Sequence, residues 1–204
     1  MIPMKRVVDK DPARAYAPPS LLRTSRTELL HLSVGIGVFF IIEASSLLRF
    51  GLPILMIVAA LTALAFILHE LAHKFTAQHF GLWSEFRIDQ FGALLSLITV
   101  FSPFKIIAPG TVVVFGSRVT MEGMGKIALA GPLANIIQVL IFTLLSQFSP
   151  HLWFAAVLNA DLALFNLIPM SILDGRKIYI WSKKAWATTF VITCIFWIML
   201  RTIL

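Results

Sequence analysis

A charge-free apolar run that leads into the motif His69-Glu70-x-x-His73 constrains this chain more than any other feature. Residues 52–68 carry no charged side chain, and a run of this length predicts a helix buried in a membrane. Two histidines four residues apart share one helix face, so both can bind one Zn²⁺ while Glu70 beside them accepts a proton from water. The alternative is a polar helix end at the membrane interface, which would not require this spacing.

The composition also indicates an integral membrane protein. The 204 residues are 58% hydrophobic and 13% charged, and the mean hydropathy is +0.88, which is far from the composition of a soluble domain. A net charge of +7 would suit nucleic acid. However, the basic residues flank apolar runs, as in membrane orientation, and form no basic stripe, so we expect no nucleic-acid partner.

We expect two regions in the chain. Residues 1–28 are basic and contain prolines, which predicts a poorly ordered tail, and residues 29–204 form a single integral membrane domain. The apolar segments predict about five transmembrane helices, over residues 29–48, 52–80, 126–147, 152–168 and 185–203. The predicted fold class is an all-α polytopic membrane protein.

The segment between the second and third predicted helices does not read as a simple span. Residues 83–89 are amphipathic and are expected at the interface, whereas residues 111–115 are rich in β-branched side chains and predict a strand. The apolar run 91–104 is short for a span, so we expect it to enter the membrane without crossing it. We therefore expect a re-entrant element that contains β-structure and packs against the helices of the motif.

The predicted helix 126–147 carries Gly131, Pro132 and Asn135 in an apolar setting. The glycine and the proline weaken the helix and free backbone groups for neighbours, water or a bound peptide. The amide of Asn135 has two interpretations. It either joins helices through hydrogen bonds or donates a hydrogen bond to the substrate or to a developing oxyanion.

A second break follows the predicted helix 152–168. Asn166 and Pro169 precede Asp174, and the proline cannot continue a helix without losing a backbone hydrogen bond. A broken helix that carries one carboxylate can present it to a metal inside a bundle. Alternatively, Asp174 caps the next helix. Together with His69 and His73 it completes a set of three ligands that leaves the fourth zinc position for water.

These three patterns together resemble the core motifs of the site-2 protease family of intramembrane zinc metalloproteases. The resemblance rests on His69-Glu70-x-x-His73, on Gly131-x-x-x-Asn135 and on the stretch from Asn166 through Pro169 to Asp174-Gly175, in family order over residues 60–180. The surroundings of Asp174 depart from many relatives, because Ile172 precedes Leu173 and Arg176 follows Gly175. The length also leaves no room for a PDZ or CBS domain, so we expect a minimal catalytic core.

The resemblance implies a role for each of these residues. His69, His73 and Asp174 would bind one Zn²⁺ per chain, Glu70 would be the general base, and Asn135 would contact the substrate or stabilise the oxyanion. Gly131, Asn166 and Pro169 would support the site or bind substrate. The implied function is hydrolysis of a peptide bond in or near the transmembrane segment of a membrane-protein substrate. The rival is a catalytically silent zinc-binding membrane scaffold or a metal carrier.

The distribution of charge predicts the orientation in the lipid bilayer. Most lysines and arginines lie in the tail and in residues 81–126 and 171–184, and the positive-inside rule places these regions in the cytoplasm. The expected location is therefore a cell membrane, crossed several times. The sequence leaves open a regulatory membrane partner or a homo-oligomer.

Overall fold

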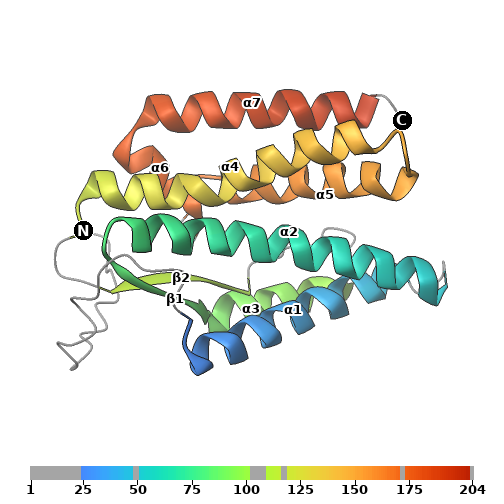
Figure 1. Ribbon diagram of the computed structural model, residues 1–204, viewed down its shortest axis with the longest axis horizontal. Helices are drawn as coiled ribbons and strands as arrows, with labels where there is room; N and C mark the ends of the chain where they lie inside the picture. The colour runs from blue at the N-terminus through green and yellow to red at the C-terminus, as the bar shows by residue number, and fades with distance from the viewer. Residues whose placement is uncertain (1–23, 48–50, 102–108, 116–118, 171–172, 203–204) are drawn as a thin grey trace.

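A computed structural model describes residues 24–47, 51–101, 109–115, 119–170 and 173–202. The described chain is mostly helical and has one small antiparallel sheet. The longer helices lie side by side along one axis, the sheet and α6 (Asp174–Trp181) lie toward one end, and α3 (Gln90–Ile98) lies beside α1 (Arg26–Leu47) (Figure 1). The predicted tail up to residue 23 lies outside the described residues.

Each of the five predicted apolar segments is helical, with small shifts at its ends. The bounds of the helices are α1 Arg26–Leu47, α2 Leu52–His79, α3 Gln90–Ile98, α4 Met121–Leu145, α5 Pro150–Asn166, α6 Asp174–Trp181 and α7 Lys183–Thr202. Helix α1 begins three residues earlier than predicted, so residues 26–28 belong to the helix and not to the tail. Helix α4 begins five residues before the predicted residue 126 and is continuous over Pro132.

Local sequence explains where the two helices of the motifs begin and end. Helix α2 follows Gly51, whose φ of 89° lies in the region that favours glycine, and it ends just before Gly81, at φ 71°. Helix α4 begins after Thr120, whose hydroxyl accepts a hydrogen bond from the backbone N–H of Gly123 at 3.0 Å.

The predicted strand is confirmed, and it pairs with a second strand that is not predicted from the sequence. Strand β2, Gly110–Phe115, pairs antiparallel with β1, Trp83–Ile88, so that Trp83 lies opposite Phe115 and Ile88 opposite Gly110. The apolar run that follows β1 forms the nine-residue helix α3 and one 3₁₀ turn, Thr99–Phe101. Both contact α1. Residues 102–104 of that run lie outside the described residues.

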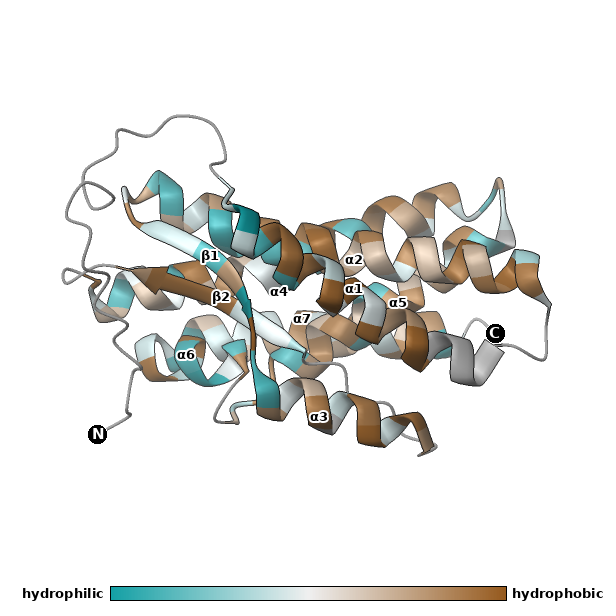
Figure 2. Cartoon of the chain, turned by 90° about the horizontal axis from the view of Figure 1, so that it is seen from below, coloured by the Kyte–Doolittle hydropathy of each residue, from teal (hydrophilic) through white to brown (hydrophobic). Residues whose placement is uncertain are grey.

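Three helices among the described residues are long and apolar enough to cross a membrane: α2, α4 and α7. They expose large apolar side chains, among them Leu52, Met56 and Phe75 on α2 and Ile137, Ile141 and Leu144 on α4. Hydrophobic residues predominate along α2 and α5, whereas hydrophilic ones gather around β1 and α6 (Figure 2). Exposed apolar surface of this extent indicates a membrane protein. Helix α5 has 17 residues and is therefore about 26 Å long, which is less than the roughly 30 Å core of a bilayer.

Candidate metal centre

Helix α2 presents the first motif on its buried side. His69 and His73 lie one turn apart, their rings meet edge to face with centroids 4.7 Å apart, and both side chains are buried. Glu70 lies between them in the sequence and is also buried. The i, i+4 spacing therefore does what the sequence predicts and brings two imidazoles together.

The break between α5 and α6 brings Asp174 to the histidines. Helix α5 ends at Asn166, and Asp174 is the first residue of α6. Its Oδ2 lies 2.9 Å from Nε2 of His73 and 3.3 Å from Nε2 of His69. Gly175 allows the start of α6 to lie directly against the backbone of Leu167, because a Cβ at that position would overlap that backbone.

Each histidine is held through its other ring nitrogen. Nδ1 of His69 lies 2.5 Å from Oδ1 of Asn135, and Nδ1 of His73 lies 2.7 Å from the backbone carbonyl oxygen of Ile127. A carbonyl oxygen only accepts, so Nδ1 of His73 carries the hydrogen and its Nε2 is left with a lone pair. The same follows for His69 when the amide oxygen of Asn135 faces it.

The three converging atoms fit one zinc ion. The two Nε2 atoms lie 3.0 Å apart, and two lone pairs beside a carboxylate oxygen repel one another unless a cation lies among them. Ligands of a tetrahedral zinc with bonds of about 2.0–2.1 Å lie about 3.3 Å apart, close to the separations seen here. Gly131 also leaves space at this point, because a Cβ there would lie 2.6 Å from Nε2 of His69 and closer still to Nε2 of His73. His69, His73 and Asp174 thus suit a single zinc ion.

Lys177 lies beside the carboxylate of Asp174, with its Nζ 3.2 Å from Oδ1. The positive charge of Lys177 favours the ionised form of this carboxyl, and the ionised form is the one that binds a metal.

Glu70 differs from the other acidic group of the site. Its Oε2 is buried and has no hydrogen-bond partner among the described residues. A buried carboxylate oxygen without a partner is costly for the fold, and a role in catalysis is one reason for which a protein keeps such a group.

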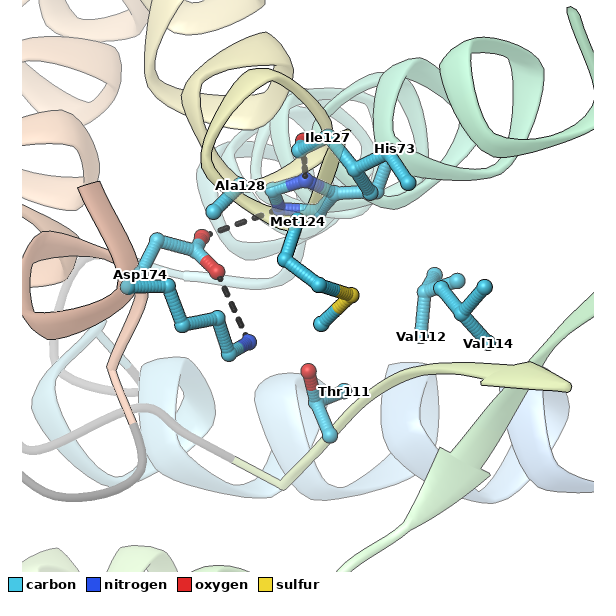
Figure 3. Close-up of a pocket in the computed structure, with 9 residues that line it drawn as sticks. His73, Thr111, Val112, Val114, Met124, Ile127, Ala128 and Asp174 are labelled. Carbon is cyan, nitrogen blue, oxygen red and sulfur yellow. Dashed lines mark hydrogen bonds and ion pairs between the residues drawn. The ribbon is translucent and has the colours of Figure 1, made fainter. Parts of the chain in front are cut away.

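A pocket opens beside the centre between β2, α4 and α6. His73 and Asp174 point toward each other at its inner end, and Thr111, Val112 and Val114 of β2 line its opposite side (Figure 3). Met124, Ile127, Ala128 and Lys177 complete the lining. Apart from Thr111, the lining is apolar on β2 and α4, and it is polar at His73, Asp174 and Lys177.

The remaining predicted residues lie at different distances from the centre. Gly131 contacts both histidines, and Asn135 reaches His69. Asn166 donates from its Nδ2 to the carbonyl oxygen of Leu162 at 3.0 Å, within its own helix. Pro169 is exposed in the connection that follows α5. Of these, Gly131 and Asn135 are thus the ones that touch the histidines.

The contacts of Asn135 agree with the interhelical alternative left open by the sequence. Its Nδ2 donates to Oδ1 of Asn159 at 2.8 Å and to the carbonyl oxygen of Ala65 at 3.4 Å, so the amide joins α4 to α2 and α5. A contact with substrate stays a prediction. Three further residues at the centre are not predicted from the sequence: Ile127, Lys177 and Asn159. For Asn159, a polar amide inside a predicted span is the signal that could have indicated it.

Two relatives in Methanocaldococcus jannaschii are similar to this chain. The first, named a putative zinc metalloprotease, is 35% identical over 178 residues, which cover 82% of this chain and 91% of the relative. The second, named a zinc metalloprotease, is 30% identical over 127 residues, which cover 58% of this chain and 32% of the relative. No family model matches the chain, and no solved structure gives a significant match. The first relative and the geometry of the centre agree, and the chain belongs to this family of zinc metalloproteases.

Proposed function

We propose that this chain is an intramembrane protease of the site-2 type, which hydrolyses a peptide bond in or near a transmembrane segment of a membrane protein. The observation that carries the proposal is the position of the motif. His69, Glu70 and His73 all lie on α2, which is itself a candidate membrane span. Ionisable groups are costly in such a helix, and their usual reason is function.

The depth of the centre follows from its place along α2. His69 lies 17 residues after Leu52, and at 1.5 Å per residue these residues carry the chain about 26 Å of the roughly 30 Å thickness of a bilayer core. The centre would then lie inside the membrane, near the interface at which α2 ends. A segment that reaches it must come from the bilayer or from that interface.

The residues around the centre can carry out the steps of hydrolysis. Zinc, when bound by His69, His73 and Asp174, supplies a Lewis acid that activates water toward a carbonyl carbon. The free Oε2 of Glu70 would take the proton of the attacking water and return it to the leaving amine. The apolar side chains that line the pocket on β2 and α4 would keep bulk water away from the scissile bond.

The pocket also suggests how a substrate approaches. A transmembrane helix must unwind before its carbonyl groups can react, because they are hydrogen-bonded and shielded. Strand β2 lines the pocket through Thr111, Val112 and Val114 and pairs with β1 on one edge. An unwound substrate segment would add as a further strand beside β2 and run past the centre.

The proposed topology has five crossings and a cytoplasmic amino end. Besides α2, α4 and α7, the helices α1 and α5 would cross; they have 22 and 17 residues, or about 33 and 26 Å. Helix α3 would enter the membrane beside α1 without crossing it. The basic residues around β1, β2 and α6 would face the cytoplasm.

The alternative is a silent zinc-binding scaffold or a metal carrier. Such a protein would bind metal through His69, His73 and Asp174 but would have no use for Glu70. A buried Glu70 with an unpartnered oxygen therefore favours the protease.

Replacing Glu70 by glutamine tests the proposal. Glu70→Gln removes the base and leaves the ligands, so the purified variant should keep about one zinc per chain and lose at least about 10²-fold in cleavage of a panel of single-pass proteins. The control is Glu122→Gln, which changes an exposed carboxylate on α4. Equal cleavage by wild type and Glu70→Gln would refute the mechanism, and zinc binding without cleavage by the wild type would favour the scaffold.

A further inference from the structure

Three helices are joined at the metal centre by a chain of hydrogen bonds between buried amides. Nδ2 of Asn159 on α5 donates to the carbonyl oxygen of Ala155 at 2.9 Å. Oδ1 of Asn159 accepts from Nδ2 of Asn135 at 2.8 Å, and Oδ1 of Asn135 lies 2.5 Å from Nδ1 of His69. Both asparagine side chains are fully buried. The chain therefore runs from the backbone of α5 through α4 to a metal ligand on α2.

The backbone carbonyl of Ala155 gives this chain a direction. A carbonyl oxygen can only accept, so the NH₂ group of Asn159 must face it and the amide oxygen must face Asn135. That oxygen in turn requires the NH₂ group of Asn135. The amide oxygen of Asn135 is then left for His69.

A second acceptor supports this orientation of Asn135. Its Nδ2 also lies 3.4 Å from the carbonyl oxygen of Ala65, four residues before His69 on α2. Turning the amide around would place its oxygen against the oxygens of both Ala65 and Asn159. Because the surroundings are buried, no water replaces the lost hydrogen bonds.

We propose that Asn159 is a positioning residue for the metal centre, acting on His69 through Asn135. By fixing the amide of Asn135, it keeps the hydrogen of His69 on Nδ1 and the lone pair of Nε2 directed at His73 and Asp174. This assigns Asn135 the role of an acceptor toward His69. The inference rests on the metal centre alone and holds whatever substrate the protease cleaves.

The inference separates the chemistry of Asn159 from its volume. Asn159→Leu keeps a buried side chain of similar size but offers no acceptor to Asn135. Asn159→Asp keeps the acceptor in either protonation state, and its protonated form also donates to Ala155. The two variants therefore differ in the hydrogen bond that the inference requires.

The test measures zinc affinity, by competition with a chromophoric chelator, and the visible spectrum of the cobalt-substituted protein. Mutation of the residues that hold metal-bound histidines typically lowers metal affinity by about 10–100-fold. Asn159→Leu should therefore weaken zinc binding by about 10-fold or more and shift the cobalt spectrum. Asn159→Asp should stay within a few-fold of the wild type. The control is Thr193→Val, which removes a buried hydrogen bond on α7, from the Thr193 hydroxyl to the carbonyl oxygen of Thr189.

Wild-type affinity and spectrum in Asn159→Leu would overturn the inference, and so would equal losses in the leucine and aspartate variants. If Asn159→Leu does not fold, as judged by circular dichroism of the metal-free protein, Asn159→Ala provides the test. Alanine removes the same acceptor without introducing a larger apolar side chain, so zinc affinity should again fall by about 10-fold or more. Wild-type zinc affinity in that variant would overturn the inference. Failure of the wild type to bind zinc would instead refute the proposed function.

Discussion

Lys74, the residue after the metal ligand His73, forms a buried ion pair with Glu28 at the start of α1. The other oxygen of the Glu28 carboxylate accepts a hydrogen bond from the backbone N–H of Phe86 in β1 at 3.0 Å. One carboxylate therefore holds together α1, the end of α2 that carries the metal centre, and the strand β1. Both charged side chains are almost completely buried.

Removing this carboxylate should destabilise the protein strongly. Glu28→Gln leaves the ammonium group of Lys74 buried without a counter-charge, and breaking a buried pair in this way typically costs about 3–5 kcal/mol. The free energy of unfolding in detergent, measured by denaturant titration, gives the value. Glu122→Gln, which breaks an exposed pair with Lys126 on α4, is the matched control and should cost at most about 1 kcal/mol. Similar losses in the two variants would contradict the role given to the buried pair.

The sequence predicted the parts of the centre that depend on local geometry. The spacing of His69 and His73 along one helix determines that they meet, since four residues make about one turn. The proline-containing break before Asp174 indicated a carboxylate at a helix start, and the structure begins α6 at that residue. Such features follow from a few neighbouring residues.

The contacts that the sequence did not predict join residues far apart in the chain. Glu28 lies 46 residues before Lys74, and the polar local composition predicts that it belongs to the tail. Asn159 and Asn135 are 24 residues apart, and neither position indicates which amide faces the other. The sequence of β1 predicts only an amphipathic interfacial stretch, because the pairing with β2 is what makes this segment a strand. These contacts depend on how the helices pack.

Gly131 should be essential for metal binding. A methyl group at this position would overlap Nε2 of both His69 and His73, and overpacking of a tight site typically costs about 1–3 kcal/mol. Gly131→Ala should therefore weaken zinc binding by about 10-fold or more without unfolding the protein, as measured by zinc content after dialysis and by circular dichroism. The control is Gly37→Ala on α1, where a methyl group meets no atom within 4 Å. Full zinc content in Gly131→Ala would show that the histidines lie farther from α4.

Turnover by an aspartate variant of Asn135 distinguishes the two roles considered for that residue. If Asn135 accepts a hydrogen bond from His69, Asn135→Asp should retain turnover within a few-fold, because the protonated carboxyl still accepts from His69 and donates its single hydrogen to Asn159. If Asn135 donates to the oxyanion, the same variant has no hydrogen left for that role, and turnover should fall by about 10²-fold or more. Initial rates of the zinc-loaded variants at saturating substrate decide between them. Asn135→Leu, which can neither accept nor donate, should be impaired under both roles and shows the full range of the assay.

The apolar run after β1 should not cross the membrane, because the metal centre fixes the direction of the helices around it. Helix α2 and the α5–α6 connection bring their ligands to one depth, which requires a single crossing, α4, between α2 and α5. A crossing by α3 would reverse that relation, and its nine residues span only about 14 Å.

In a Cys194→Ser background, Thr120→Cys and Ser182→Cys should react with a membrane-impermeant thiol reagent only after the cytoplasmic face is opened. Gln147→Cys, in the turn that follows α4, should react in intact cells and serves as the opposite control. Labelling of Thr120→Cys in intact cells would place the start of α4 outside and refute the proposed topology.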